Sequence, residues 1–228
     1  MKKRFFIAGT DTDAGKTLVT TGLLTAANRR GLRTIGLKPV AAGCEQTPDG
    51  LRNADALLLQ QAASVKLSYE QVNPIAFEPP IAPHIAAEQE GRVLTADRLA
   101  AYCRGSMMQP ADLVLVEGAG GWRVPLSMRE SLARLPQLLE LDVILVVGMK
   151  LGCINHAILT AEAIARDGLR LAGWVANHID PDMSCPDENL ATLERLFRAP
   201  LLGRVPWLDA PDPERVADYL DLTPLLDK

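Results

Sequence analysis

Short apolar runs alternate with helical patterns along most of this chain. The runs are mostly aliphatic, which is typical of parallel strands that are buried on both faces of a sheet. They lie at residues 5–8, 33–37, 113–116, 143–147, 171–176 and 201–205. Apolar residues at helical spacing fall between them, at about residues 16–30, 54–64, 95–105, 131–140, 154–167 and 186–198. This alternation predicts an α/β fold with a doubly wound, mostly parallel sheet.

Residues 68–94 show neither pattern clearly. Prolines crowd this segment at positions 74, 79, 80 and 83, and proline both removes a backbone donor and restricts the residue before it. We expect a loop here, with one short helix near residues 85–90. Because the chain contains no internal repeat and no linker, residues 1–228 are predicted to form a single domain.

A glycine-rich loop directly follows the first apolar run. Residues 9–17 read Gly-Thr-Asp-Thr-Asp-Ala-Gly-Lys-Thr, and a helical pattern starts at Lys16. A strand, a loop and a helix in this order allow backbone N–H groups and a helix N-terminus to bind a polyphosphate. Lys16 would add a charge near the terminal phosphates, and Thr17 would offer a hydroxyl to Mg²⁺. Five residues separate Gly9 from Gly15 instead of the usual four, so an ordinary glycine turn is the alternative.

Charged residues follow other predicted strands, at the sheet edge where ligands bind in doubly wound folds. Lys38 follows the second strand, and Glu117 follows the third, where P-loop enzymes place a carboxylate that helps to hold Mg²⁺. Asp55 opens the next predicted helix. Two lysines beside a polyphosphate would stabilise charge on a migrating phosphoryl group. The alternatives are a solvated lysine at 38, a helix charge at 55 and a turn cap at 117.

Composition narrows the class of protein. The net charge is −4 with both signs interspersed, so there is no basic tract for nucleic acid. Four cysteines lie far apart without a C-x-x-C pair, which predicts free thiols in a reducing compartment. The apolar stretch after the basic N-terminus is too short for a signal peptide, and no run reaches the roughly 18 residues that span a membrane. We therefore expect a soluble, cytoplasmic protein without nucleic-acid or membrane partners.

Several motifs together resemble dethiobiotin synthetase. They are residues 9–17, Lys38-Pro-Val, Val116-Glu-Gly-Ala-Gly-Gly, residues 147–157 and Gly173-Trp-Val-Ala-Asn. The resemblance runs from about residue 4 to Leu208 and implies a P-loop NTPase type of fold. It implies ATP- and Mg²⁺-dependent closure of a ureido ring on 7,8-diaminononanoate (7,8-diaminopelargonate) with CO₂, which yields dethiobiotin, ADP and phosphate. The implied intermediates are a carbamate and a carbamic–phosphoric anhydride, so the lack of a Ser-His-Asp or Cys-His signature is consistent with it.

The resemblance also implies roles for particular residues. Thr12, Lys16 and Lys38 would surround the carbamate and the γ-phosphate, and Thr17, Asp55 and Glu117 would hold Mg²⁺. ATP would be bound by Asp13, Ala14, Gly15, Lys16, Thr17, Leu18, Asp55, Glu117, Gly118, Ala119, Gly120, Asn177, His178, Pro206, Trp207 and Leu208, with the Asn177 amide reading the adenine edge. The diamine would be bound by Ala42, Gly152, Cys153, Ile154 and Asn155. The family binds the substrate carboxylate across a subunit interface, so a homodimer is implied.

The chain departs from the family's usual pattern at a few positions. Ala42 stands where serine is common, and Asn189 stands where some members have tyrosine. His178 follows Asn177 where aspartate is common, and the acidic residues after Trp207 are shifted by one position. The last shift leaves Glu214 without a firm ribose role. Since none of these positions belongs to the phosphate or Mg²⁺ set, they bear on substrate affinity more than on the type of reaction.

Two other classes of P-loop protein remain as alternatives. The first is a nucleotide switch or partitioning ATPase, but the position of that group's signature lysine is Asp11 here. A guanine-binding signature is matched at only two of three fixed positions by Asn177-His178-Ile179-Asp180. The second is an amidotransferase-type ligase, which needs a glutaminase domain for which this chain has no room. ATP turnover only with a diamine and bicarbonate would separate these classes.

Overall fold

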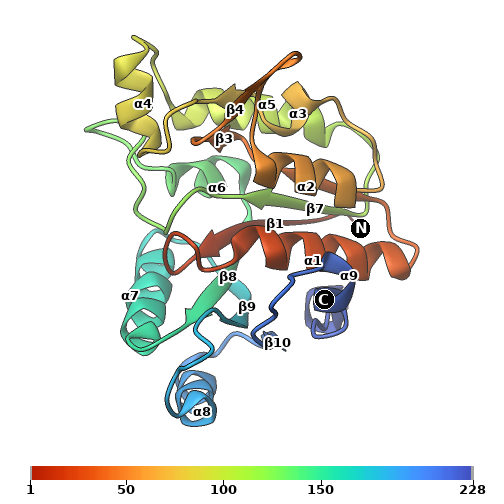
Figure 1. The fold of residues 1–228 in the computed structure, drawn as a ribbon, viewed down its shortest axis with the longest axis vertical. Coiled ribbons are helices and arrows are strands. Elements are labelled where there is room, and N and C mark those ends of the chain that lie inside the picture. The colour runs from red at the N-terminus through yellow and green to blue at the C-terminus, as the bar shows by residue number, and fades with distance from the viewer. Residues whose placement is uncertain (1, 227–228) are drawn as a thin grey trace.

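A parallel sheet runs through the middle of the computed structural model, which describes residues 2–226 (Figure 1). Its six strands are arranged in the order β10-β9-β8-β1-β7-β2, and every neighbouring pair is parallel. The strands are β1 (Lys3–Gly9), β2 (Thr34–Leu37), β7 (Leu113–Glu117), β8 (Asp142–Met149), β9 (Leu171–His178) and β10 (Leu201–Val205). All six predicted strands are therefore confirmed, and so is the doubly wound arrangement.

Helices cover both faces of this sheet, and the six predicted helical patterns each contain one. These are α1 (Lys16–Arg29), α2 (Ala54–Ala62), α5 (Ala96–Met107), α6 (Arg134–Leu139), α7 (Cys153–Arg166) and α8 (Pro186–Leu196). Two short helices, α9 (Pro213–Ala217) and α10 (Thr223–Leu226), complete the fold, and α9 lies beside α1 (Figure 1).

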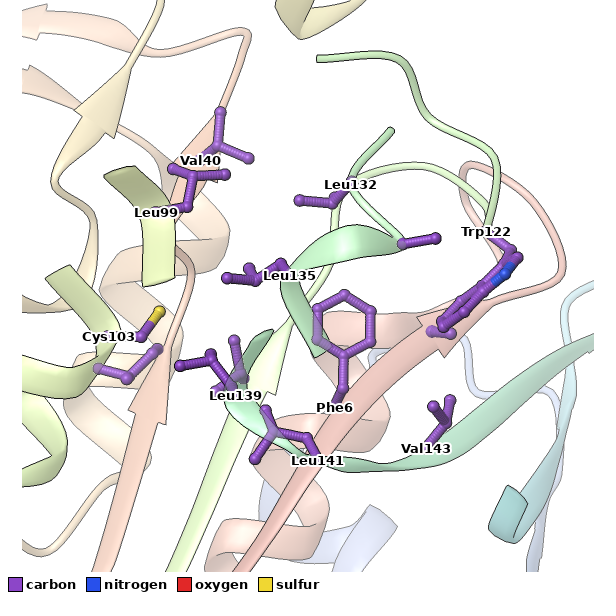
Figure 2. Close-up of a cluster of buried hydrophobic side chains, with 14 of the residues drawn as sticks. Phe6, Val40, Leu99, Cys103, Trp122, Leu132, Leu135, Leu139, Leu141 and Val143 are labelled. Carbon is purple, nitrogen blue, oxygen red and sulfur yellow. The ribbon is translucent and has the colours of Figure 1, made fainter. Parts of the chain in front are cut away.

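The alternation of side chains along β1 divides the core into two clusters. Phe5 and Ile7 pack with residues of α1, α9 and α10 on one face. Phe6 points to the other face and packs with α5, α6 and α7, because successive side chains of a strand point to opposite faces. Figure 2 shows Phe6 in the middle of this second cluster, near Trp122, whose ring lies edge-on to it with centroids 6.1 Å apart. Burial on both faces fixes the position of β1 in the sheet. It therefore also fixes the position of the glycine loop that follows this strand.

The segment at residues 68–94 is more ordered than the sequence pattern predicts. The helix expected near residues 85–90 is present as α4 (Pro83–Gln89), but the prediction of loop was wrong at two further short elements. A further helix, α3 (Tyr69–Val72), starts at a capping box in which Ser68 and Gln71 exchange hydrogen bonds. Strand β6 (Ile75–Ala76) pairs with β3 (Val40–Ala41), a partner far away in the sequence, so periodicity could not reveal it.

Between β3 and α2 lies a small hairpin made of β4 (Glu45–Thr47) and β5 (Gly50–Arg52). The four cysteines all fall within the described residues and are free thiols, as predicted. Nowhere in residues 2–226 is there a helix with the length and apolar character needed to cross a membrane.

Candidate active site

The glycine-rich loop at residues 9–17, which we call the P-loop, connects β1 to α1. A side chain from the end of β9 holds it in position. Gly15 has a φ of +86°, a left-handed conformation that glycine adopts without strain. The side chain of Asn177 lies against this glycine, and its Nδ2 donates to the carbonyl oxygen of Ala14 at 3.0 Å. A Cβ on Gly15 would lie 2.0 Å from that Nδ2. The loop therefore needs glycine at position 15 for two reasons. The backbone there is left-handed, and the side chain of Asn177 leaves no room for a Cβ.

Lys16 starts α1 and lies almost completely inside the loop. Its Nζ donates to the carbonyl oxygen of Asp11 at 3.1 Å. The described first turn of α1 has neither an acidic residue nor a side-chain cap, so its N–H groups remain available to an anion. Burial, followed by the nearby charge of Lys38, lowers the pKa of Lys16. The carboxylates around it act in the opposite direction.

Lys38 joins two of the predicted metal ligands. Its Nζ donates to Oδ2 of Asp55 at 2.7 Å and to Oε1 of Glu117 at 2.6 Å. Thr17 Oγ1 donates to the same Glu117 oxygen at 2.8 Å. Lys38 is 5% exposed and Glu117 is fully buried, so each charge depends on the other. Lys38 is therefore not a solvated surface lysine and Glu117 is not a cap of a surface turn, whereas Asp55 does lie in the first turn of α2, as the helix-charge alternative expects.

The charges in this group reinforce one another despite burial. Burial opposes the positive charge of Lys38, but the carboxylates of Glu117 and Asp55 outweigh burial and raise the pKa of this lysine. Burial likewise opposes the charge on Asp55, yet the Lys38 ammonium and the Thr17 hydroxyl lower the pKa of that carboxyl. The pair is thus held in its ionised form, ready to interact with a charged ligand.

The oxygen atoms of Thr17, Asp55 and Glu117 form a donor set that suits Mg²⁺. Oε2 of Glu117 is buried without a hydrogen-bond partner among the described residues. A buried carboxylate oxygen without a partner is costly, and an ion or its water would satisfy it. Within residues 2–226, no group of three or more His, Cys, Asp or Glu is arranged to hold a metal. The remaining ligands of Mg²⁺ would therefore come from phosphate and water.

A cavity of about 440 Å³ opens above this group. It is lined by Thr12, Asp13, Gly15, Lys16, Thr17, Leu18, Lys38, Ala41, Ala42, Asn53, Asp55, Pro83, Ala119 and Gly120. The structure thus brings together at one cavity Thr12, Lys16, Lys38, Thr17 and Asp55, whereas of the residues predicted to bind the diamine only Ala42 lines it. Sequence reasoning missed Ala41, Asn53 and Pro83. Asn53 could have been found, because asparagine just before a helical pattern is an N-cap signal, and its side chain does cap α2.

Some of the residues predicted to bind ATP gather at a second, smaller hollow of about 130 Å³. His178, Pro206 and Trp207 line it together with Arg204, while Leu208 packs against the core beside α1. Arg204 Nε donates to Nε2 of His178 at 3.1 Å. Burial, and then the charge of Arg204, lowers the pKa of His178. Sequence reasoning missed Arg204, which reaches this hollow from the neighbouring strand β10.

The residues predicted to bind the substrate carboxylate lie elsewhere, at the start of α7. Gly152, with a φ of +94°, precedes Cys153, which is buried and whose N–H donates to the carbonyl oxygen of Lys150 at 2.9 Å. Gly152, Cys153, Ile154 and Asn155 do not line the cavity at the P-loop. Cys153 Sγ donates to Oδ1 of Asn189 at 3.9 Å, which brings α8 next to this helix start.

The parallel sheet, the glycine loop between β1 and α1 and the carboxylate at the end of β7 define a P-loop NTPase. Solved structures with this fold include chloroplast FtsY from Physcomitrella patens, with a TM-score of 0.54 and 16% identity. The match covers 100% of this chain and 64% of that one. FtsY from Elizabethkingia anophelis has a TM-score of 0.55 and 15% identity, with 100% and 65% covered. These two similarities show the fold alone. A family model described as "AAA domain" also matches residues 3–215 of this chain.

Relatives with much higher identity show the family. The ATP-dependent dethiobiotin synthetase BioD of Cellvibrio japonicus is 64% identical over 226 residues, which are 99% of each chain. The protein of the same description from Marinobacter nauticus is 54% identical over 231 residues, and BioD 1 of Salmonella typhi is 50% identical over 226, again with 99% of each chain covered. The chain therefore belongs to the ATP-dependent dethiobiotin synthetase family and is an ATP-dependent ligase of biotin biosynthesis. The alternatives of a nucleotide switch and an amidotransferase-type ligase are not favoured.

Proposed function

We propose that this chain closes the ureido ring of dethiobiotin from 7,8-diaminononanoate and CO₂, and uses Mg²⁺ and ATP to do so. It would act in the cytoplasm as a homodimer. The observation that carries the proposal is the hydrogen-bonded group of Lys38, Glu117, Asp55 and Thr17, which meets Lys16 at one cavity. This supports the proposal because Lys38 and Lys16 would supply two cations, and the group a set of oxygen donors for Mg²⁺, near the terminal phosphates of a nucleotide on the P-loop.

The proposed reaction needs positioning and charge rather than a nucleophile of the protein. One amine of the substrate adds to CO₂ and loses a proton, which gives a carbamate. A carbamate oxygen then forms a bond to the γ-phosphorus as the bond to ADP breaks. The second amine attacks the carbonyl carbon, and phosphate leaves as the ring closes. Lys16 and Lys38 would offset the negative charge that develops in the phosphoryl transfer.

The donor set of Thr17, Asp55 and Glu117 gives a prediction about metal dependence. These side chains would hold Mg²⁺, which would offset the negative charge of the phosphates. We expect Thr17→Val, Asp55→Asn and Glu117→Gln each to raise the Mg²⁺ concentration for half-maximal activity by about tenfold, since each removes an oxygen ligand or its charge. The measurement is a titration of activity against Mg²⁺ at saturating ATP.

The chain offers a matched control for this titration. Asp97 is the second residue of α5, just as Asp55 is the second residue of α2, and both helices start with a side-chain cap. Asp97→Asn should leave the Mg²⁺ requirement unchanged. If Asp55→Asn behaves in the same way, Asp55 acts only as an N-terminal helix charge.

The start of α7 gives a prediction about the diamine. We expect Asn155→Pro to raise the KM for the diamine much more than that for ATP, because it deletes one N–H of the proposed carboxylate site and leaves every charge in place. Cys153→Ala should stay active, since its buried sulfur has no chemical role in the proposal.

Sedimentation of the active enzyme tests the dimer, and a fully active monomer would show that the site is not shared between subunits.

One experiment tests the proposed function directly. The purified chain is incubated with diaminononanoate, ¹³C-bicarbonate, Mg²⁺ and ATP, and the products are examined by mass spectrometry. The expected product is dethiobiotin that carries a single ¹³C in its ureido carbonyl, formed together with one ADP. ATP hydrolysis that continues at the same rate without the diamine would instead indicate a nucleotide switch or a partitioning ATPase.

A further inference from the structure

A chain of buried hydrogen bonds connects two parts of the active site through α3. The backbone N–H of Asn53 donates to the hydroxyl oxygen of Tyr69 at 2.7 Å. The Tyr69 hydroxyl donates to Oδ1 of Asn73 at 2.9 Å, and Asn73 Nδ2 donates to the carbonyl oxygen of Lys38 at 2.6 Å. Tyr69 is 7% exposed and Asn73 is 3% exposed, while the backbone ends of the chain belong to buried residues as well.

Both ends of this chain of bonds hold residues of the active site. Asn53 is the N-cap of α2, where its Oδ1 accepts from Ala56 N at 3.2 Å, and Asp55 lies in the first turn of that helix. Lys38 is held at both backbone groups, because its N–H also donates to the carbonyl oxygen of Val72 at 2.9 Å. The Lys38 ammonium meets the Asp55 carboxylate at 2.7 Å. Together with the backbone between Asn53 and Asp55, these hydrogen bonds form a closed ring that starts at the Lys38 backbone and returns to the Lys38 side chain. We call this ring the circuit.

We propose that Tyr69 and Asn73 are positioning residues that set the placement of Lys38 relative to Asp55. The inference rests on the proposed function of that site. Each buried polar atom in the circuit needs its partner, so the loss of one bond leaves at least one group unpaired and favours a shift of the backbone. A shift of about 1 Å in a catalytic group can lower turnover by about 10²-fold.

The tyrosine is itself held firmly. The guanidinium of Arg52 lies over its ring, 4.1 Å from the centroid. Burial raises the pKa of Tyr69, so its hydroxyl keeps the proton that it donates to Asn73. The contact with Arg52 thus holds the ring that carries the hydroxyl. This rigidity is what a positioning residue requires.

The test uses variants that remove single links. Tyr69→Phe deletes only the hydroxyl, and Asn73→Leu has a similar shape without polar atoms. We expect each to lower kcat by about tenfold or more and to raise the Mg²⁺ requirement, with the KM for ATP nearly unchanged. Binding of Mn²⁺ to the complex with a non-hydrolysable ATP analogue, followed by electron paramagnetic resonance, should weaken in parallel. In the double variant with Asp55→Asn, the two effects on metal affinity should not be additive.

Two controls separate positioning from a general loosening of α3. Ser106 Oγ donates to the carbonyl oxygen of Gln71 at 2.8 Å and anchors the same helix to α5 without touching the circuit. Ser106→Ala should lower the melting temperature but leave kcat and Mn²⁺ binding unchanged. Tyr102→Phe makes the identical chemical change at a partly exposed tyrosine on α5 and should change nothing.

The inference is wrong if Tyr69→Phe and Asn73→Leu keep normal kcat and Mn²⁺ binding. It is also wrong if both variants lose activity only in proportion to the loss of folded protein, with a normal kcat for each folded molecule. A failure of the proposed function is a different result, because the unaltered chain would then form no dethiobiotin.

Discussion

Replacing Lys38 by alanine is expected to lower turnover by about 10²–10³-fold, the loss that typically follows removal of one transition-state contact. The loss of ATP affinity should be smaller, because in the proposed reaction the charge of Lys38 would contribute more as the phosphoryl group moves than in the bound ground state. Two carboxylate oxygens accept from Lys38 Nζ among the described residues. The third ammonium hydrogen is then available to an oxygen of the carbamate or the γ-phosphate. Steady-state kinetics with ATP and the diamine measure both the loss of turnover and the loss of ATP affinity.

Removal of Lys38 also affects its neighbour Glu117. Glu117 is fully buried and would lose its cation in the Lys38→Ala protein, and such an unpaired charge costs about 3–5 kcal/mol. The double variant Lys38→Ala with Glu117→Gln removes that charge. It should recover thermal stability without recovering turnover. Turnover near that of the parent in Lys38→Ala would remove Lys38 from the mechanism.

Gly15→Ala is expected to have the second large effect, a fall in turnover of about 10²-fold caused by a displaced P-loop. A residue other than glycine at a φ of +86° is strained by about 1–2 kcal/mol. The added Cβ would also lie 2.0 Å from Nδ2 of Asn177. That contact forces the loop and the amide apart and breaks the bond from Asn177 to the Ala14 carbonyl. Titration of ATP by calorimetry should show a matching loss of affinity.

Gly31→Ala is the matched control for this change. Gly31 has a φ of +77° at the other end of α1, and no atom lies within 4 Å of a Cβ built there. It should therefore lose stability through backbone strain alone and keep normal ATP affinity. If Gly15→Ala binds ATP as the parent does, the P-loop and Asn177 can move apart freely and the contact does not fix the site.

The sequence determined the sheet and the phosphate end of the site. The strands are nearly continuous aliphatic runs because a parallel sheet is buried on both faces, so local composition is enough to find them. Lys16, Thr17 and Glu117 could be placed because each directly follows a strand or its loop, and the ends of parallel strands meet at one edge. Lys38 could be placed by the same rule. The burial of Lys38 between Asp55 and Glu117 could not be predicted, because the distance between two side chains depends on how the helix or strand that carries each of them packs.

Only the tertiary structure decided how these residues are held. The proline-rich segment at 68–94 folds into α3 and β6 because it pairs with β3 and packs on α5, and these contacts are distant in the sequence. The same segment places Tyr69 and Asn73 between Lys38 and Asn53. Arg204 reaches His178 from the neighbouring strand in the same way. A periodic pattern reports which face of an element is buried, whereas a hydrogen bond between buried groups depends on the alignment of separate elements in space.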